Sequence, residues 1–462
     1  MFLFLKGVKK DRLSYVAGYW LKNGVAPPEK RGGDRRSASS KPQKEAIRKH
    51  IESFQCKASH YARRGAPGRK YLPCDLSVKK MHEMFEDQNH QQVSYGLYYS
   101  VFVYDFNLGF GSPAKDMCGT CMQLKMKQRD PSLSLEDRRN LIGQLISHKQ
   151  VAHKFYRELN SVGKSLTICF DVMENLVLPK TSVGQAFYSR QLYMYVFGIV
   201  VHRGEGQGQM KEDVNLYWWT EIQNKKDSSM IASALLHCLK SAVGPKPETL
   251  EHLRLFSDGC YGQNKNISVI SMLFSLRKSL LCNTKIEYFF PVRGHSFLPA
   301  DRVFGRLEQS IRKQDPILHP SEYVDIMAKH GKTYEYGKDF ISYDFKTEAL
   351  KHCKQARTFK LSEAKVCEIN GDTLGVKTSY YGEFTYHSLL KRGRKWSTYC
   401  PNIGEMVNCI KPAKKRDVMK LLDAIGVSDS AKTFYIEACK DVNERDVTND
   451  NDELSSDDET EP

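Results

Sequence analysis

Three acidic stretches lie at the ends of apolar runs in the central part of the chain. Two of these runs have the length of buried strands, and each ends in an aspartate, Asp171 in one and Asp258 in the other. The third leads through the turn Gly294-His295 into a helical pattern that carries Asp301 and Glu308. Carboxylates that converge from separate strands and a helix are the oxygen ligands that a pair of magnesium ions needs for phosphodiester chemistry.

The segments around these acids alternate between strand and helix patterns in a definite order. Three strand patterns in succession are followed by helix, strand, helix, strand and helix. This order predicts an α/β domain over residues 161–315, with a mixed sheet flanked by helices. The expected strands are 166–170, 191–201, 214–220, 253–256 and 285–292, and the expected helices are 228–242, 267–281 and 299–312.

The rest of the chain is expected to form smaller parts on either side of this core. Helical periodicity recurs before it, short strand patterns separated by turns follow it, and the last segment is too acidic and polar to fold. The expected parts are a basic flexible arm (1–44), a helical module resembling a helix-turn-helix (45–110), a zinc-binding connector (111–160), a small β module with flanking helices (316–440) and a disordered acidic tail (441–462).

The charge of the chain points to an anionic partner. The formal net charge is +16, but residues 441–462 carry a net −9, so the remaining chain carries +25. A body this basic favours binding to nucleic acid, and we expect DNA. Apolar stretches long and uncharged enough to cross a membrane are not seen, so no membrane partner is expected. The expected DNA contacts are Arg35, Arg36, Arg63, Arg64, Arg69 and Lys70.

A set of cysteines and histidines has the ligand types of a zinc site. Cys118 and Cys121 form a CxxC pair, and His148 and His153 follow after a gap of twenty-six residues. Thiolate and imidazole ligands together suit a structural Zn²⁺ with four protein ligands. Positions i and i+5 do not share one helix face, so the helix would have to end between the two histidines.

Six short segments of the chain carry recognisable motifs: Ser59–Tyr61, Asp116–Cys121, Phe170–Pro179, Tyr188–Leu192, Phe256–Asn264 and Gly294–Asp301. These motifs resemble a large family of transposon-derived animal proteins whose central region is a domain of unknown function. The strand and helix order is also similar to that of the ribonuclease H-like fold, which many DDE/D transposases and integrases share. The resemblance implies a nuclear, DNA-binding protein that works as a dimer or larger assembly.

The resemblance also implies roles for the acidic residues. Asp171 and Asp258 match the first two catalytic aspartates, which hold Mg²⁺ or Mn²⁺, and His295 is a candidate for proton transfer or phosphate contact. The third acid is Asp301 or Glu308, because seven residues of helix span about 10 Å whereas paired metals lie about 4 Å apart. We favour Asp301, which lies at the helix start.

Three functions remain open at this point. The first is cutting or joining of DNA phosphodiester bonds by two-metal-ion chemistry. The second is a catalytically inactive, domesticated DNA- or chromatin-binding protein. The third is a ribonuclease or exonuclease of the same fold.

Overall fold

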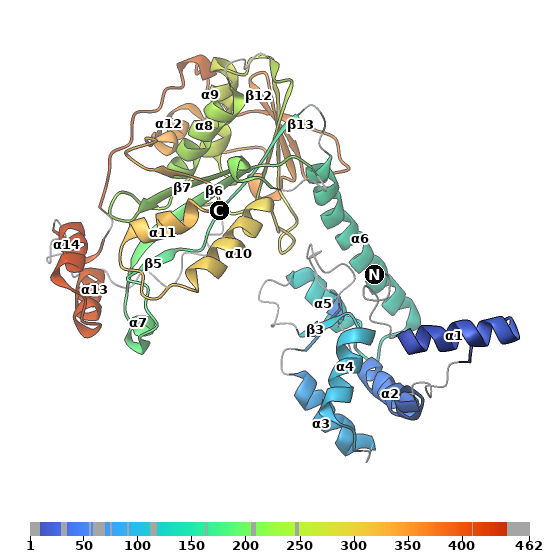
Figure 1. Ribbon diagram of the computed structural model, residues 1–462. Helices are drawn as coiled ribbons and strands as arrows, with labels where there is room; N and C mark the ends of the chain where they lie inside the picture. The colour runs from blue at the N-terminus through green and yellow to red at the C-terminus, as the bar shows by residue number, and fades with distance from the viewer. Residues whose placement is uncertain are drawn as a thin grey trace. The chain divides into compact units, whose positions relative to one another are not determined.

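The chain divides into two compact units, Met1–Asp116 and Met117–Pro462. Figure 1 shows the computed structural model. It describes residues 10–28, 35–54, 57–58, 70–73, 76–89, 92–110, 118–161, 163, 165–204, 209–244, 249–408 and 410–440.

The first unit is built from helices and a small sheet. Its apolar core is formed by side chains of three helices, including Ile47, Ile51, Met81 and Phe85, and the imidazole Nδ1 of His50 lies 2.8 Å from the Tyr98 hydroxyl inside it. Its elements are helices α1 (Lys10–Asn23), α2 (Arg35–Ser53), α3 (Val78–Asn89) and α4 (Tyr95–Asp105) and strands β1 (Lys57–Ala58), β2 (Lys70–Leu72) and β3 (Leu108–Phe110).

The described part of segment 1–44 is largely helical, which corrects the prediction of a flexible arm. Helix α1 begins at Lys10 and α2 begins at Arg35. The segment 35–41 contains no glycine, and its Arg, Lys and Ala residues have good helix propensity. The polar composition of this segment is therefore compatible with a helix and does not by itself indicate a flexible linker.

The second unit begins with two helices, α5 (Gly119–Lys127) and α6 (Leu135–Asn160), and continues into a large mixed sheet. The strand order is β10-β7-β6-β4-β8-β9-β11-β12-β13, and β5 pairs with β6 outside this path. The strands are β4 (Ser165–Val172), β5 (Leu176–Leu178), β6 (Leu192–Val201), β7 (Val214–Thr220), β8 (His252–Ser257), β9 (Lys285–Phe289), β10 (Lys332–Glu335), β11 (Val366–Asn370), β12 (Thr373–Lys377) and β13 (Thr385–Ser388).

The centre of this sheet confirms the predicted α/β class and a mixed sheet flanked by helices. Strands β4, β8 and β9 run parallel to one another, and β6 runs antiparallel to both β4 and β7. The long connection between β4 and β6 contains β5 and the short helix α7 (Gly184–Tyr188). The other helices of this unit are α8 (Ser228–Val243), α9 (Ile267–Ser279), α10 (Pro299–Ile311), α11 (Pro320–Met327), α12 (Phe345–His352), α13 (Pro412–Ala424) and α14 (Asp429–Ala438).

Helices cover both faces of the sheet. Helices α8, α9 and α12 lie on one face, and α10 and α11 lie on the other (Figure 1). Successive side chains along each strand point to opposite faces of the sheet, as the two-residue period of a strand requires. Phe170 of β4 packs into the core under α8 and α9, whereas Cys169 and Phe256 pack against Phe155 of α6 on the opposite face.

The strands predicted to form a separate C-terminal β module extend the main sheet instead. Strand β11 pairs antiparallel with β9, and β12 and β13 follow in the same sheet. At the other edge, β10 pairs parallel with β7. The prediction failed because short strand patterns do not reveal their partner, and the edge of β9 offers unpaired backbone groups to any strand that can reach it.

None of the described helices has the length and apolar character needed to span a membrane. The acidic segment 441–462, predicted to be disordered, lies outside the described residues.

Candidate active site and metal centre

Asp171 and Asp258 lie side by side at the ends of two neighbouring parallel strands. In the β4–β8 register Phe170 is opposite Ser257, so the next residue on each chain is one of the two aspartates. Neighbouring strands lie about 4.8 Å apart. Both side chains are partly buried. Asp171 is the penultimate residue of β4 and Asp258 directly follows β8, so both lie close to the strand ends that the sequence pattern predicted.

An asparagine links the two carboxylates. The Nδ2 of Asn264 lies 2.6 Å from Oδ1 of Asp258 and 3.5 Å from Oδ1 of Asp171. Asn264 is fully buried, and its Oδ1 has no hydrogen-bond partner among the residues that the structure describes. The Tyr288 hydroxyl of β9 donates to the Asn264 carbonyl at 2.9 Å and lies 2.6 Å from Ser257 Oγ, which fixes the loop after β8.

Asp301 approaches the pair from helix α10. Its Oδ2 accepts a hydrogen bond from the Leu298 amide at 2.6 Å, which caps the helix start. One turn later Phe304 packs on β6 at Gly198, the residue paired with Asp171 across the sheet. A Cβ added at Gly198 would lie 2.7 Å from the Phe304 ring, so the absence of a side chain lets α10 lie this close.

The three aspartates interact electrostatically. Burial raises the pKa of the Asp171 carboxyl well above its ordinary value, and the negative charges of Asp258 and Asp301 raise it further. Hydrogen bonds from the Val172 amide and from Asn264 act in the opposite direction. Without a cation, this site disfavours the ionised form of Asp171, because a carboxylate would be placed in a buried, negative environment.

Glu308, the alternative third acid, lies apart from this site. It lies two helical turns beyond Asp301 and forms an ion pair with Arg312 at 3.5 Å. Lys265, in the loop that follows Asp258, is buried, and its Nζ donates to the carbonyls of Ser362 and Ala364. The loop therefore contributes the side-chain amide of Asn264 to the acidic site, whereas Lys265 binds elsewhere.

A second cluster brings two cysteines and two histidines together. Among the described cysteine, histidine and acidic residues, the group whose ligand atoms all lie within 4.8 Å of one another is Cys118, Cys121, His148 and His295. The aspartates described above do not form so tight a group. The Cys118 Sγ lies 3.2 Å from His148 Nε2, the Cys121 Sγ lies 3.4 Å from His295 Nε2, and the two Nε2 atoms lie 3.2 Å apart.

His295 therefore occupies the place that the sequence analysis gave to His153, and it faces the cysteines. The structure places His295 in this cluster, and its role in proton transfer or phosphate contact stays a prediction. Five residues turn a helix by about 140°, so His153 and His148 point to different sides of α6. His153 is exposed. Burial lowers the pKa of His148, which keeps the imidazole in its neutral, ligating form.

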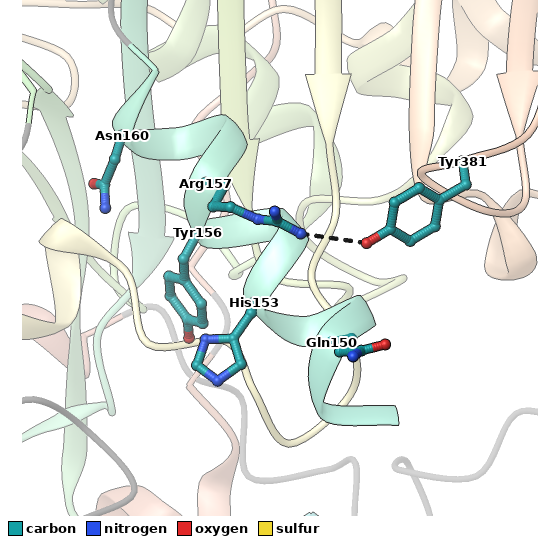
Figure 2. A pocket seen from close by; sticks show the side chains of 6 residues that line it. All are labelled: Gln150, His153, Tyr156, Arg157, Asn160 and Tyr381. Atoms are coloured by element: carbon teal, nitrogen blue, oxygen red, sulfur yellow. Dashed lines mark hydrogen bonds between the residues drawn. The ribbon is translucent and has the colours of Figure 1, made fainter. Parts of the chain in front are cut away.

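His153 lines a hollow of about 580 Å³ on α6 instead. Figure 2 shows its side chain beside those of Tyr156 and Arg157, with Tyr381 of the turn after β12 opposite them. The Arg157 guanidinium donates to the Tyr381 hydroxyl at 3.3 Å. The hollow combines a cation, an imidazole and two phenol rings, which are groups that bind phosphates and bases.

The predicted DNA contacts lie in the first unit, and the structure describes part of them. Arg35 and Arg36 belong to α2, and Lys70 is exposed on β2. Arg63, Arg64 and Arg69 lie outside the described residues.

The fold and the acidic site together define the chain as a mixed α/β protein with carboxylates at the ends of parallel strands. A family model described as "Domain of unknown function (DUF7869)" matches residues 186–369. This match confirms the expected central domain of unknown function. It includes Asp258, His295 and Asp301, whereas Asp171, Cys118 and Cys121 lie outside it. No curated protein matches the sequence.

Three supporting residues were missed or only partly recognised in the sequence. Gly198 has no signal in an apolar strand, because its role depends on Phe304 more than 100 residues later. Tyr288 reads as an ordinary strand residue. Asn264 had a signal, since it follows Asp258 in a loop rich in glycine and amide side chains.

Proposed function

We propose that this protein is a ribonuclease H-like, transposase-derived enzyme that cuts or joins DNA phosphodiester bonds with two Mg²⁺ or Mn²⁺ ions. The observation that carries the proposal is the pairing of Asp171 and Asp258 at the ends of β4 and β8, with Asp301 near enough to act on the same carboxyl. Acidic side chains are held this close only at an energetic cost, and a cation removes that cost.

The sheet supports this proposal. The strand order β7-β6-β4-β8-β9, with β6 antiparallel to its neighbours and the other four strands parallel to one another, agrees with the order expected of a ribonuclease H-like domain. A helix follows β9 and carries the third acid. Fold alone does not define an activity, so the argument rests on the acids.

The residues present fit hard divalent cations. Carboxylate and amide oxygens are the ligands that Mg²⁺ prefers, and the buried Oδ1 of Asn264 has no partner in the described part of the chain. Asp171, Asp258 and Asp301 would hold the ions. When bound, such ions activate a water or a DNA hydroxyl and stabilise the leaving oxygen. Asn264 keeps the first two carboxylates oriented, and Leu298 orients the third.

A nucleic-acid partner is supported by charge and by the α6 hollow. The chain outside residues 441–462 carries a net +25. The hollow offers the Arg157 cation and the Tyr381 ring, and its Tyr156 also contacts the loop that leads to Asp301. A strand bound along α6 would therefore run toward the acidic site. Nuclear localisation and assembly as a dimer belong to the same proposal.

The test is cleavage by the purified full-length chain. Supercoiled plasmid, single-stranded DNA, single-stranded RNA and an RNA–DNA hybrid are incubated with Mg²⁺ or Mn²⁺, and nicks and products are quantified. We expect metal-dependent nicking of DNA that falls at least about 100-fold in Asp258→Asn, because an essential metal ligand is lost. The matched control is Asp325→Asn, which removes the charge of an exposed aspartate on α11 and should leave nicking unchanged.

Other outcomes select the competing functions. If the protein binds DNA in a salt-sensitive way but no preparation cleaves it, the function is that of a catalytically inactive DNA-binding protein and not of an enzyme. Preference for RNA or for single strands would indicate a ribonuclease or exonuclease. Nicking that survives Asp258→Asn would refute the assignment of the site.

A further inference from the structure

We propose that the cluster of two cysteines and two histidines binds one zinc ion, and that this ion fixes the turn from which helix α10 starts. The ligands are Cys118, Cys121, His148 and His295. The zinc assignment stands on the cluster alone, whereas its consequence for Asp301 rests on the proposed function.

The distances in the cluster suit a tetrahedral ion. Zinc bonds of about 2.3 Å to sulfur and about 2.0–2.1 Å to nitrogen place tetrahedral ligand atoms about 3.3–3.8 Å apart. The three separations given above are 3.2, 3.4 and 3.2 Å, and all the ligand atoms lie within 4.8 Å of one another. Two thiolates and two imidazoles fill four positions, which is the composition of a closed structural site.

The ligands come from three segments that are distant in the sequence. Cys118 and Cys121 lie at the start of α5, His148 lies on α6, and His295 follows β9. The backbone is shaped for this meeting. Gly294 has a φ of +76°, and a Cβ there would lie 2.6 Å from the Cα of Cys118. Only glycine allows the turn to approach the CxxC segment this closely.

Hydrogen bonds continue from the cluster to the acid. The Tyr156 hydroxyl of α6 donates to the carbonyl of His295 at 2.8 Å and accepts from the Phe297 amide at 3.1 Å. The next amide, that of Leu298, donates to Asp301. Only five residues therefore lie between a proposed zinc ligand, His295, and a proposed magnesium ligand, Asp301, and each end of this segment is held.

The first experiment measures metal content. The full-length protein, purified without added metal, should contain about one zinc ion per chain. His148→Ala, His295→Ala and Cys121→Ser should lose most of it, and His153→Ala should retain it. His153 is the matched control because it lies on the same helix and was the fourth ligand suggested by sequence spacing. His295→Cys should restore zinc binding, since three thiolates and one imidazole also form a zinc site.

A second measurement remains informative if a variant fails to fold. Cobalt substituted into the unmutated protein should give the intense visible bands of tetrahedral Co²⁺ and a thiolate charge-transfer band, because Co²⁺ replaces Zn²⁺ in such sites. Stoichiometric iron in place of zinc, an octahedral cobalt spectrum, or zinc that is lost in His153→Ala and kept in His295→Ala would each overturn the assignment.

The coupling to Asp301 has its own readout. Removal of zinc by a chelator should speed hydrogen exchange at the amides of Phe297 and Leu298 at least about tenfold, because local opening becomes easier when one anchor is lost. Unchanged exchange at these amides would refute the coupling while leaving the zinc site intact. None of these three measurements uses cleavage, so a protein that binds zinc but cuts no DNA would separate this inference from the proposed function.

Discussion

The close approach of α10 to the sheet at Gly198 gives a prediction that connects packing with the acidic site. A methyl group at this position would lie 2.7 and 2.8 Å from two atoms of the Phe304 ring. Carbon atoms prefer separations of about 3.5–4.0 Å. The Gly198→Ala variant therefore requires the ring to move by roughly 1 Å. Because Phe304 lies one turn after Asp301, we expect the helix start to move with it.

The magnitude follows from two opposing contributions. Overpacking of a buried site costs about 1–3 kcal/mol. Replacing glycine by alanine also restricts the unfolded chain, which offsets about 0.4–1 kcal/mol. We expect a net loss of about 1–2 kcal/mol in the free energy of unfolding. DNA nicking should fall by more than the loss of folded protein explains, because Asp301 would be displaced in the molecules that remain folded as well.

Urea denaturation and the plasmid assay together test this reasoning. Phe304→Leu makes room beside Gly198, so Gly198→Ala should cost less in its presence, which a double-mutant cycle measures. The matched control is Gly305→Ala, on the same helix, where no described atom beyond the adjacent residues and the nearby helix backbone lies within 4 Å of the added Cβ. That control should stabilise the protein by about 0.5–1 kcal/mol. Gly198→Ala with normal stability and no coupling to Phe304 would refute the argument.

Three further predictions concern residues that support the site. Asp171→Asn should raise the free energy of unfolding in urea at about pH 7 without added divalent ions, and this gain should shrink toward about pH 4. The pKa of Asp171 is raised in the folded state, so its ionisation costs stability as the pH rises above the unfolded value of about 3.9. A gain of equal size at both pH values would contradict this. Tyr288→Phe should cost about 1–3 kcal/mol, because the buried carbonyl of Asn264 loses its donor, and an unchanged urea midpoint would show that this hydrogen bond is replaceable. Arg254→Met should cost about 2–3 kcal/mol, because the hydrogen bonds of its buried guanidinium to the Ser161 carbonyl and to Glu158 are lost. A loss under about 0.5 kcal/mol in the same assay, typical of a surface site, would argue against these interactions.

The central part of the fold was predictable because its signals are local. The runs that became β4 and β8 are apolar, short and followed by an aspartate, and both aspartates lie where the pattern placed them. The predicted helix 299–312 corresponds to α10, Pro299–Ile311. Periodicity reports on residues within one element, and that information was sufficient here.

The remaining features depend on partners that no local pattern contains. His295 joins Cys121 across 174 positions of sequence, whereas the prediction chose His153 because it was near. The mismatch of five residues between His148 and His153 was the available warning. Strand β11 could be recognised as a strand, but not as the neighbour of β9.

Helix α6 is a rigid element that is anchored at two points. Its C-terminal end is fixed to the sheet, where Arg254 donates to the Ser161 carbonyl and to Glu158. Ten residues earlier, about 15 Å along the axis, His148 reaches the cysteines. A helix resists bending over this length, so any force on the exposed N-terminal half of α6 is delivered to the turn at His295. A ligand that binds the N-terminal half of α6 would therefore influence the position of Asp301 without contacting it.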